Sequence, residues 1–135
     1  MKRNEIKELT RAEEQVMQAI WNVQQGFANE IVTAVNERND PKDSTAVAYN
    51  TVLTVVRILV QKGFVAHETF NRANRYYPIV SREEYMEQML GRMTRSWFGS
   101  SSRALVSFLV DRNEVTLQDL ETLTNEIEQK QINNK

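Results

Sequence analysis

The chain has 135 residues, of which 41% are hydrophobic and 26% charged, and its net charge is −1 at neutral pH. This composition is typical of a soluble globular protein with one domain or two very small ones. There is no cysteine and a single histidine, His67, which excludes a disulfide framework, an iron–sulfur cluster and the usual zinc sites. We expect neither a cofactor nor a metal ion, and any attraction for nucleic acid has to be local because the overall charge is nearly neutral.

No segment is predicted to enter a membrane. Residues 1–8 are charged and precede no apolar segment, so they do not resemble a signal peptide. The longest apolar-rich stretch, 52–60, is interrupted by Thr54 and Arg57 and is far shorter than the ~20 residues of a spanning helix. The sequence therefore predicts a cytoplasmic protein.

The first two predicted elements are helices. Thr10 and Glu13 form a capping-box pattern that opens a helix over residues 11–23. Its apolar residues recur at helical spacing and are Ala12, Val16, Met17, Ile20 and Trp21. Residues 28–38 form a second helix, which is poorly capped because Phe27 stands where serine or threonine is preferred. A polar stretch with a proline over 39–44 predicts a loop.

The third predicted helix covers residues 48–62, ends at Gly63 and has two distinct faces. One face is apolar and consists of Val52, Val55, Val56 and Leu59. The opposite face is polar and carries Asn50, Thr54, Arg57 and Gln61. The helix is therefore expected to pack on one side and to offer hydrogen-bonding groups on the other.

A β-hairpin is predicted after Gly63. Residues 64–70 and 75–80 are rich in aromatic and β-branched side chains, and they flank the turn-forming tetrad 71–74. Pro78 is expected only in an edge strand, because proline cannot donate a hydrogen bond to a neighbouring strand.

The rest of the chain reads as three helices, over residues 82–98, 103–110 and 117–129, with a frayed polar tail at 131–135. These helices are too short to close a core alone, so we expect a homodimer to bury their apolar residues. The predicted dimer contacts are Met86, Leu90, Met93, Trp97, Leu105, Leu117, Leu120 and Ile127. The predicted domains are 1–80 and 81–135.

The order helix, turn, helix and two-stranded ribbon is that of a winged helix-turn-helix, so the predicted fold is mainly α with a small hairpin. Residues 41–80 hold five basic and two acidic residues, a net charge of +3, whereas 81–135 has −2. Double-stranded DNA is the predicted partner, with the third helix in the major groove and the wing on the flank. The candidate contacts are Tyr49, Asn50, Thr51, Leu53, Thr54, Arg57, Arg72 and Arg75. For Tyr49 a core position is equally compatible with the pattern.

An ordered set of segments resembles the penicillinase and methicillin-resistance repressors, the BlaI/MecI/CopY family. The segments are LTRAEEQVMQAIW (9–21), ANEIV (28–32), AYNTVLT (48–54), QKGFV (61–65), YPIVSREE (77–84), FGS (98–100) and ALV (104–106). The resemblance implies a homodimeric repressor that binds a pseudo-palindromic operator and dimerises through its C-terminal helices. It also implies that Leu53 replaces a basic residue of some relatives, which suits contact with a thymine methyl group.

The resemblance further implies inactivation by cleavage, in a pathway that starts at a membrane sensor metalloprotease. The family's scissile Asn-Phe pair aligns with Ser107 and Phe108, where the Phe is kept and the Asn is not. The copper-responsive branch uses C-terminal cysteines, which this chain lacks. We expect no enzyme, because the only base available to a catalytic serine in 100–102 is His67. The alternative function is a winged-helix module that binds another protein through its polar helix face.

Overall fold

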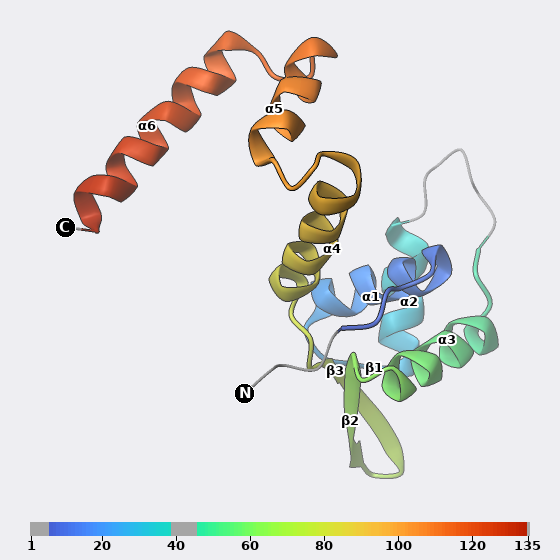
Figure 1. Cartoon of the computed structure of the whole chain (residues 1–135). Coiled ribbons are helices and arrows are strands. Elements are labelled where there is room, and N and C mark those ends of the chain that lie inside the picture. The colour runs from blue at the N-terminus through green and yellow to red at the C-terminus, as the bar shows by residue number, and fades with distance from the viewer. Residues whose placement is uncertain (1–5, 39–45, 135) are drawn as a thin grey trace. The chain divides into compact units, whose positions relative to one another are not determined.

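The computed structural model describes residues 6–38 and 46–134, so the predicted loop over 39–44 lies outside the described residues. The chain is mainly helical with a small sheet, as predicted (Figure 1). Its elements are α1 (Arg11–Val23), β1 (Gly26–Phe27), α2 (Ala28–Arg38), α3 (Tyr49–Gln61), β2 (Val65–Phe70), β3 (Ala73–Pro78), α4 (Arg82–Trp97), α5 (Ser102–Asp111) and α6 (Leu117–Asn133). They divide into two compact units, one ending at Gln88 and one beginning at Met89.

Helix α1 begins at the predicted capping box. The Thr10 hydroxyl accepts from the Glu13 amide at 3.2 Å, and the Glu13 carboxylate accepts from the Thr10 amide at 3.1 Å. The predicted apolar stripe is wrong at its first position, because Ala12 is exposed and Glu13 is buried instead. The buried face runs from Glu13 through Val16 to Ile20, which is the same helix face at a spacing of three and four residues.

The sheet has three antiparallel strands in the order β1-β3-β2. Strand β1 was not predicted, since two residues are too few to show a periodic pattern. The expectation of an edge strand is wrong because β3 is the central strand, but at Pro78 itself β3 has no partner on its β1 side. Pro78 is tolerated there because it pairs only with Val65 of β2, while β1 reaches no farther than Tyr76.

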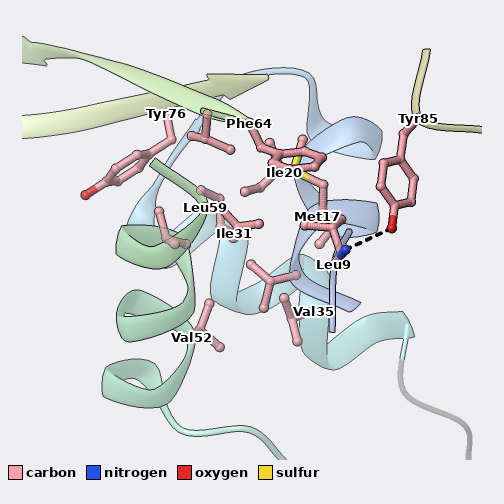
Figure 2. Packing of buried hydrophobic residues seen from close by; sticks show 14 residues of the cluster. Leu9, Met17, Ile20, Ile31, Val35, Val52, Leu59, Phe64, Tyr76 and Tyr85 are labelled. Atoms are coloured by element: carbon pink, nitrogen blue, oxygen red, sulfur yellow. Dashed lines mark hydrogen bonds between the residues drawn. The ribbon is translucent and has the colours of Figure 1, made fainter. Parts of the chain in front are cut away.

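The core of the first unit is built by α1, α2, α3 and the base of the hairpin (Figure 2). Met17, Ile20, Ile31, Leu59 and Phe64 are fully buried at its centre. This core holds α3 by its apolar face and fixes where the opposite, polar face points.

The first turns of α4 belong to the same core. The Tyr85 hydroxyl accepts a hydrogen bond from the Leu9 amide at 3.0 Å (Figure 2), and its ring lies 5.6 Å from that of Phe64. Gln88 exchanges two hydrogen bonds with the backbone of Ile6. The first unit therefore extends past residue 80, because α4 supplies residues that its core needs.

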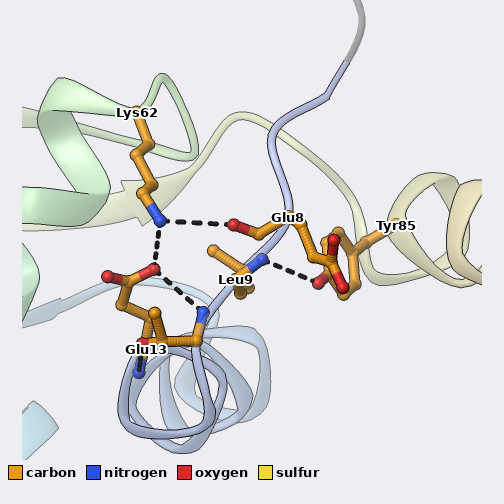
Figure 3. Close-up of polar contacts among 6 residues, drawn as sticks. Glu8, Leu9, Glu13, Lys62 and Tyr85 are labelled. Carbon is orange, nitrogen blue, oxygen red and sulfur yellow. Dashed lines mark hydrogen bonds and ion pairs between the residues drawn. The ribbon is translucent and has the colours of Figure 1, made fainter.

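A partly buried ion pair connects the start of α1 to the end of α3 (Figure 3). The Lys62 ammonium donates to the Glu13 carboxylate and to the Glu8 carbonyl, the latter at 3.2 Å. Burial raises the pKa of Glu13, but the hydrogen bonds from Lys62 and Thr10 outweigh it and hold the pKa below 4.5. The pair anchors the C-terminal end of α3.

The second unit has well-capped helices but little core. Ser101 caps α5, and Thr116 forms a capping box with Asp119 at α6. Neither α5 nor α6 contains a buried residue. The prediction of a frayed tail is wrong for residues 131–133, which continue α6 to Asn133. Within the described ranges, no helix is both long and apolar enough to cross a lipid bilayer.

Candidate nucleic-acid interface

Helix α3 presents the polar face that its sequence predicts. Val52, Val56 and Leu59 are buried against α1 and α2, whereas the polar side chains on the other side are exposed. The exposed polar residues are Asn50, Thr51, Thr54, Arg57 and Gln61. A helix of 13 residues is about 20 Å long and has a diameter that fits the major groove of B-DNA.

Two predicted contacts on α3 have a defined local geometry. The Thr54 hydroxyl donates to the Asn50 carbonyl at 2.8 Å, which uses its only proton. Thr54 is therefore left with an acceptor oxygen and a methyl group to offer outward. Tyr49, for which a core position was equally compatible, is 48% exposed.

The hairpin extends away from the three helices as a wing (Figure 1). Its strands are joined by the two residues Asn71 and Arg72, with φ of 48° and 70°. Two successive positive φ values are those of a type I′ turn, in which glycine is strongly preferred at the second position. An arginine held at this position costs about 1–2 kcal/mol, and such strain is often retained for function.

A groove lies between α3, the start of α2 and the wing. It encloses a cavity of about 370 Å³. The lining residues are Phe27, Ala28, Asn29, Tyr49, Leu53, Arg57, Arg72, Ala73, Asn74 and Tyr76. Four of the predicted DNA contacts meet here, namely Tyr49, Leu53, Arg57 and Arg72, although they come from segments far apart in the sequence. None of the lining residues is acidic.

Sequence reasoning missed two amide side chains in this groove, Asn29 and Asn74. Asn74 belongs to the predicted turn tetrad, but the strand register assigns it to β3, opposite Thr69. The position of Asn74 opposite Thr69 follows only from the register between β2 and β3. Asn29 lies at the start of α2, where no pattern in the sequence indicates that it faces the wing.

The basic residues of the region differ in how much charge they offer. Lys62 is paired with the buried Glu13. The Arg75 guanidinium lies 3.4 Å from the Glu68 carboxylate and 4.4 Å from the centre of the Phe70 ring. By contrast, Arg57 and Arg72 have no ion pair among the residues that the structure describes. Among the described basic residues of 46–80, the charge that has no ion pair therefore lies in the groove.

The arrangement combines the exposed polar face of α3, which carries Arg57, with Arg72 of the wing, and neither arginine has an ion pair among the described residues. Within 6–38 and 46–134, no three His, Cys, Asp or Glu side chains are placed to hold a metal ion. Hydrogen-bond donors and fixed positive charge in a groove suit a phosphate-bearing polymer.

Comparison with known proteins gives a consistent match over nearly the whole chain. The family model described as penicillinase repressor matches residues 9–129. The methicillin resistance regulatory protein MecI of Staphylococcus aureus strain N315 is 24% identical over 129 residues, which cover 94% of this chain and 98% of that protein. An uncharacterised 16.5 kDa protein of Latilactobacillus sakei is 25% identical over 113 residues, covering 84% of this chain and 73% of that protein.

Among solved structures, the DNA-binding domain of the repressor BlaI is similar with a TM-score of 0.49 and 23% identity, covering 62% of this chain and 94% of that domain. Bacillus licheniformis BlaI in complex with the blaP half-operator has a TM-score of 0.47 and 23% identity, covering 60% of this chain and 92% of that chain. The family is described as a repressor and MecI as a regulatory protein, in agreement with the sequence prediction that the chain is not an enzyme.

Proposed function

The chain belongs to the penicillinase repressor family, and we propose that it represses transcription by binding a pseudo-palindromic DNA operator as a homodimer. In this proposal α3 enters the major groove and the wing holds the flanking backbone. The half-sites are about one helical turn or more apart, because each protomer reads one of them. A DNA-binding repressor of this kind acts in the cytoplasm.

The groove between α3 and the wing is the observation that supports this function best. Its two unpaired arginines, Arg57 and Arg72, are suited to DNA phosphates, and the exposed residues Asn50 and Thr51 of α3 are suited to base edges. Arg75 has the smaller share of binding, because Glu68 already neutralises part of its charge. With two unpaired arginines among the described residues of the groove, the repressor depends on base contacts more than on general attraction to DNA.

Homodimerisation is supported by the uncovered apolar side chains of the C-terminal helices. Trp97 is 80% exposed and Leu117 is 73% exposed, which is unusual for large hydrophobic residues in a stable protein. The predicted contacts Met86, Leu90, Met93 and Ile127 are also exposed, while Leu105 and Leu120 are partly exposed. A second copy, related by two-fold symmetry, would cover the same residues on both protomers. In this proposal residues 1–80 bind DNA and 81–135 dimerise, and the first turns of α4 serve both parts because they also pack into the core of the first unit.

Binding to the chain's own upstream region tests the repressor function. The affinity of purified protein for that region and for random duplex of equal length is measured by fluorescence anisotropy between 50 and 200 mM salt. We expect a preference for the upstream region and a steep loss of affinity with salt. Absence of any salt-sensitive preference would refute the proposal and would favour the alternative, a module that binds another protein.

Inactivation by proteolysis is a finer part of the proposal. Ser107 and Phe108 lie inside α5, and Phe108 is 49% exposed with its ring 5.7 Å from that of Phe98. The helix around a peptide bond has to unfold locally before a protease can hydrolyse that bond. Because α5 contains no buried residue, we expect its local unfolding to cost little free energy. Coexpression with a neighbouring sensor metalloprotease, followed by mass spectrometry, should give fragments ending at Ser107. An intact chain in the induced state would refute this step.

A further inference from the structure

The strand register places Thr69 of β2 opposite Asn74 of β3, one pair away from the turn of the wing. We propose that Asn74 donates a hydrogen bond to a backbone phosphate of the operator, and that Thr69 positions it. This inference rests on the proposed DNA binding and adds two residues that the sequence did not indicate.

The orientation of the Asn74 amide follows from one hydrogen bond. The Thr69 hydroxyl donates to the Asn74 carbonyl oxygen, Oδ1, at 2.9 Å. Because Oδ1 is the accepting end of the amide, the opposite end, Nδ2, carries the two remaining donors. Thr69 thus sets which end of the amide is available to a ligand.

The face of the wing that carries this pair is the one turned toward α3. Side chains alternate along a strand, so Asn74 shares its face with Tyr76, which is buried against the helices. Asn74 itself is half-buried and lines the 370 Å³ cavity together with Arg57 and Arg72. Arg75 lies on the other face, with Glu68 and Phe70.

The chemistry of the cavity selects a phosphate. Two guanidinium groups and the Asn74 amide offer donors, and none of the described residues that line the walls carries a carboxylate. The aromatic side chains of Phe27, Tyr49 and Tyr76 provide apolar surface against which a deoxyribose fits. A phosphodiester has the required acceptor oxygens and negative charge, and the sugar beside it suits the apolar wall.

Asn74→Asp tests the donor directly. The substitution keeps the size of the side chain and an oxygen for Thr69, but replaces the amide donors by an oxygen that repels phosphate. We expect operator affinity of the full-length dimer to fall tenfold or more, with unchanged thermal unfolding. Asn74→Ala should weaken binding by about tenfold at an unchanged salt slope, because a neutral contact releases no counterion. Arg72→Gly should lower the slope.

The role of Thr69 is tested by a pair of variants. Thr69→Val removes the hydroxyl that orients Asn74 and should weaken binding about as much as Asn74→Ala, whereas Thr69→Ser keeps the hydroxyl and should bind like the unchanged protein. A pair that only stabilised the hairpin would lower the melting temperature and leave the affinity of the folded protein unchanged.

A neutral methylphosphonate, introduced at one operator phosphate at a time, identifies the contact. When the two symmetry-related phosphates bound by Asn74 are both replaced, the loss caused by Asn74→Ala should disappear, whereas replacement in one half-site should reduce the tenfold loss to about threefold. Affinities of the Asn74 variants within twofold of the unchanged protein, at an intact salt slope, would overturn the inference while leaving the proposed function in place. If the unchanged protein showed no salt-sensitive binding to the operator, the proposed function itself would be overturned.

Discussion

Replacing Arg72 with glycine separates the function of the wing from its stability. Arg72 has a φ of 70° in a two-residue turn, where a side chain is strained and glycine is not. Most substitutions in a binding site weaken both folding and binding, or only binding. At this position glycine is expected to maintain or raise the stability while it weakens DNA binding, so a loss of binding cannot be explained by unfolding.

The effect on stability follows from the backbone. Relief of the left-handed conformation contributes about 1–2 kcal/mol, and the greater freedom of glycine in the unfolded chain removes about 0.4–1 kcal/mol of that gain. Arg72→Gly should therefore leave the free energy of unfolding unchanged or raise it by up to about 1.6 kcal/mol. Urea titration followed by circular dichroism measures this difference.

The effect on binding follows from the loss of one phosphate contact in each half-site. The slope of log affinity against log salt should become less steep by about 0.9 per half-site, or about 1.8 for a dimer on its full operator. Between 50 and 200 mM salt, the affinity of the variant should accordingly fall about 12-fold less than that of the unchanged protein. Fluorescence anisotropy with a labelled operator measures both affinities.

Arg112→Gln is the matched control, since it removes the same charge from a residue that pairs with Glu114 in the second unit. It should leave the salt slope unchanged. An unchanged slope for Arg72→Gly, or an equal change for Arg112→Gln, would refute a phosphate contact at the wing. A clear loss of stability in Arg72→Gly would refute the argument from strain.

Three further predictions concern the core of the first unit, the proposed dimer and helix α3. Glu13→Gln should lower the free energy of unfolding at pH 7 by about 1.5–3 kcal/mol, because Lys62 loses its charged partner. The pKa of Glu13 is lowered in the folded state, so the stabilisation by the Glu13–Lys62 pair is complete above about pH 4.5 and is lost as the pH falls through the folded-state pKa. If urea titrations showed that Glu13→Gln and the unchanged protein lose stability equally in acid, this prediction would be wrong. Trp97→Glu should convert the dimer to a monomer in sedimentation velocity, whereas Ser96→Glu, on the same helix, should not; a dimeric Trp97→Glu protein would exclude Trp97 from the interface. Replacing operator thymines by deoxyuracil should weaken binding about fourfold where Leu53 contacts the methyl group, and the same operator should show no such difference with Leu53→Ala.

Much of the fold could be predicted because it is encoded in short-range patterns. The capping box of Thr10 and Glu13 marks the start of α1, and the structure confirms both of its hydrogen bonds. Helical spacing identified the buried face of α3, and alternation with turn residues identified the hairpin. Each of these signals depends on residues within a few positions of one another, so the sequence alone contains them.

The tertiary structure decided what depends on partners distant in the chain. The burial of Glu13 results from Lys62, 49 positions away, and strand β1 exists because β3 offers it hydrogen bonds. The charge of the groove also depends on distant residues, because the sequence does not show which basic side chains form ion pairs in the folded protein. The overall charge of −1 first argued against nucleic acid. In the described part of the chain, ion pairs engage Lys62 and Arg75, whereas Arg57 of α3 and Arg72 of the wing keep their charge in the groove, which is the local charge that the proposed DNA binding needs.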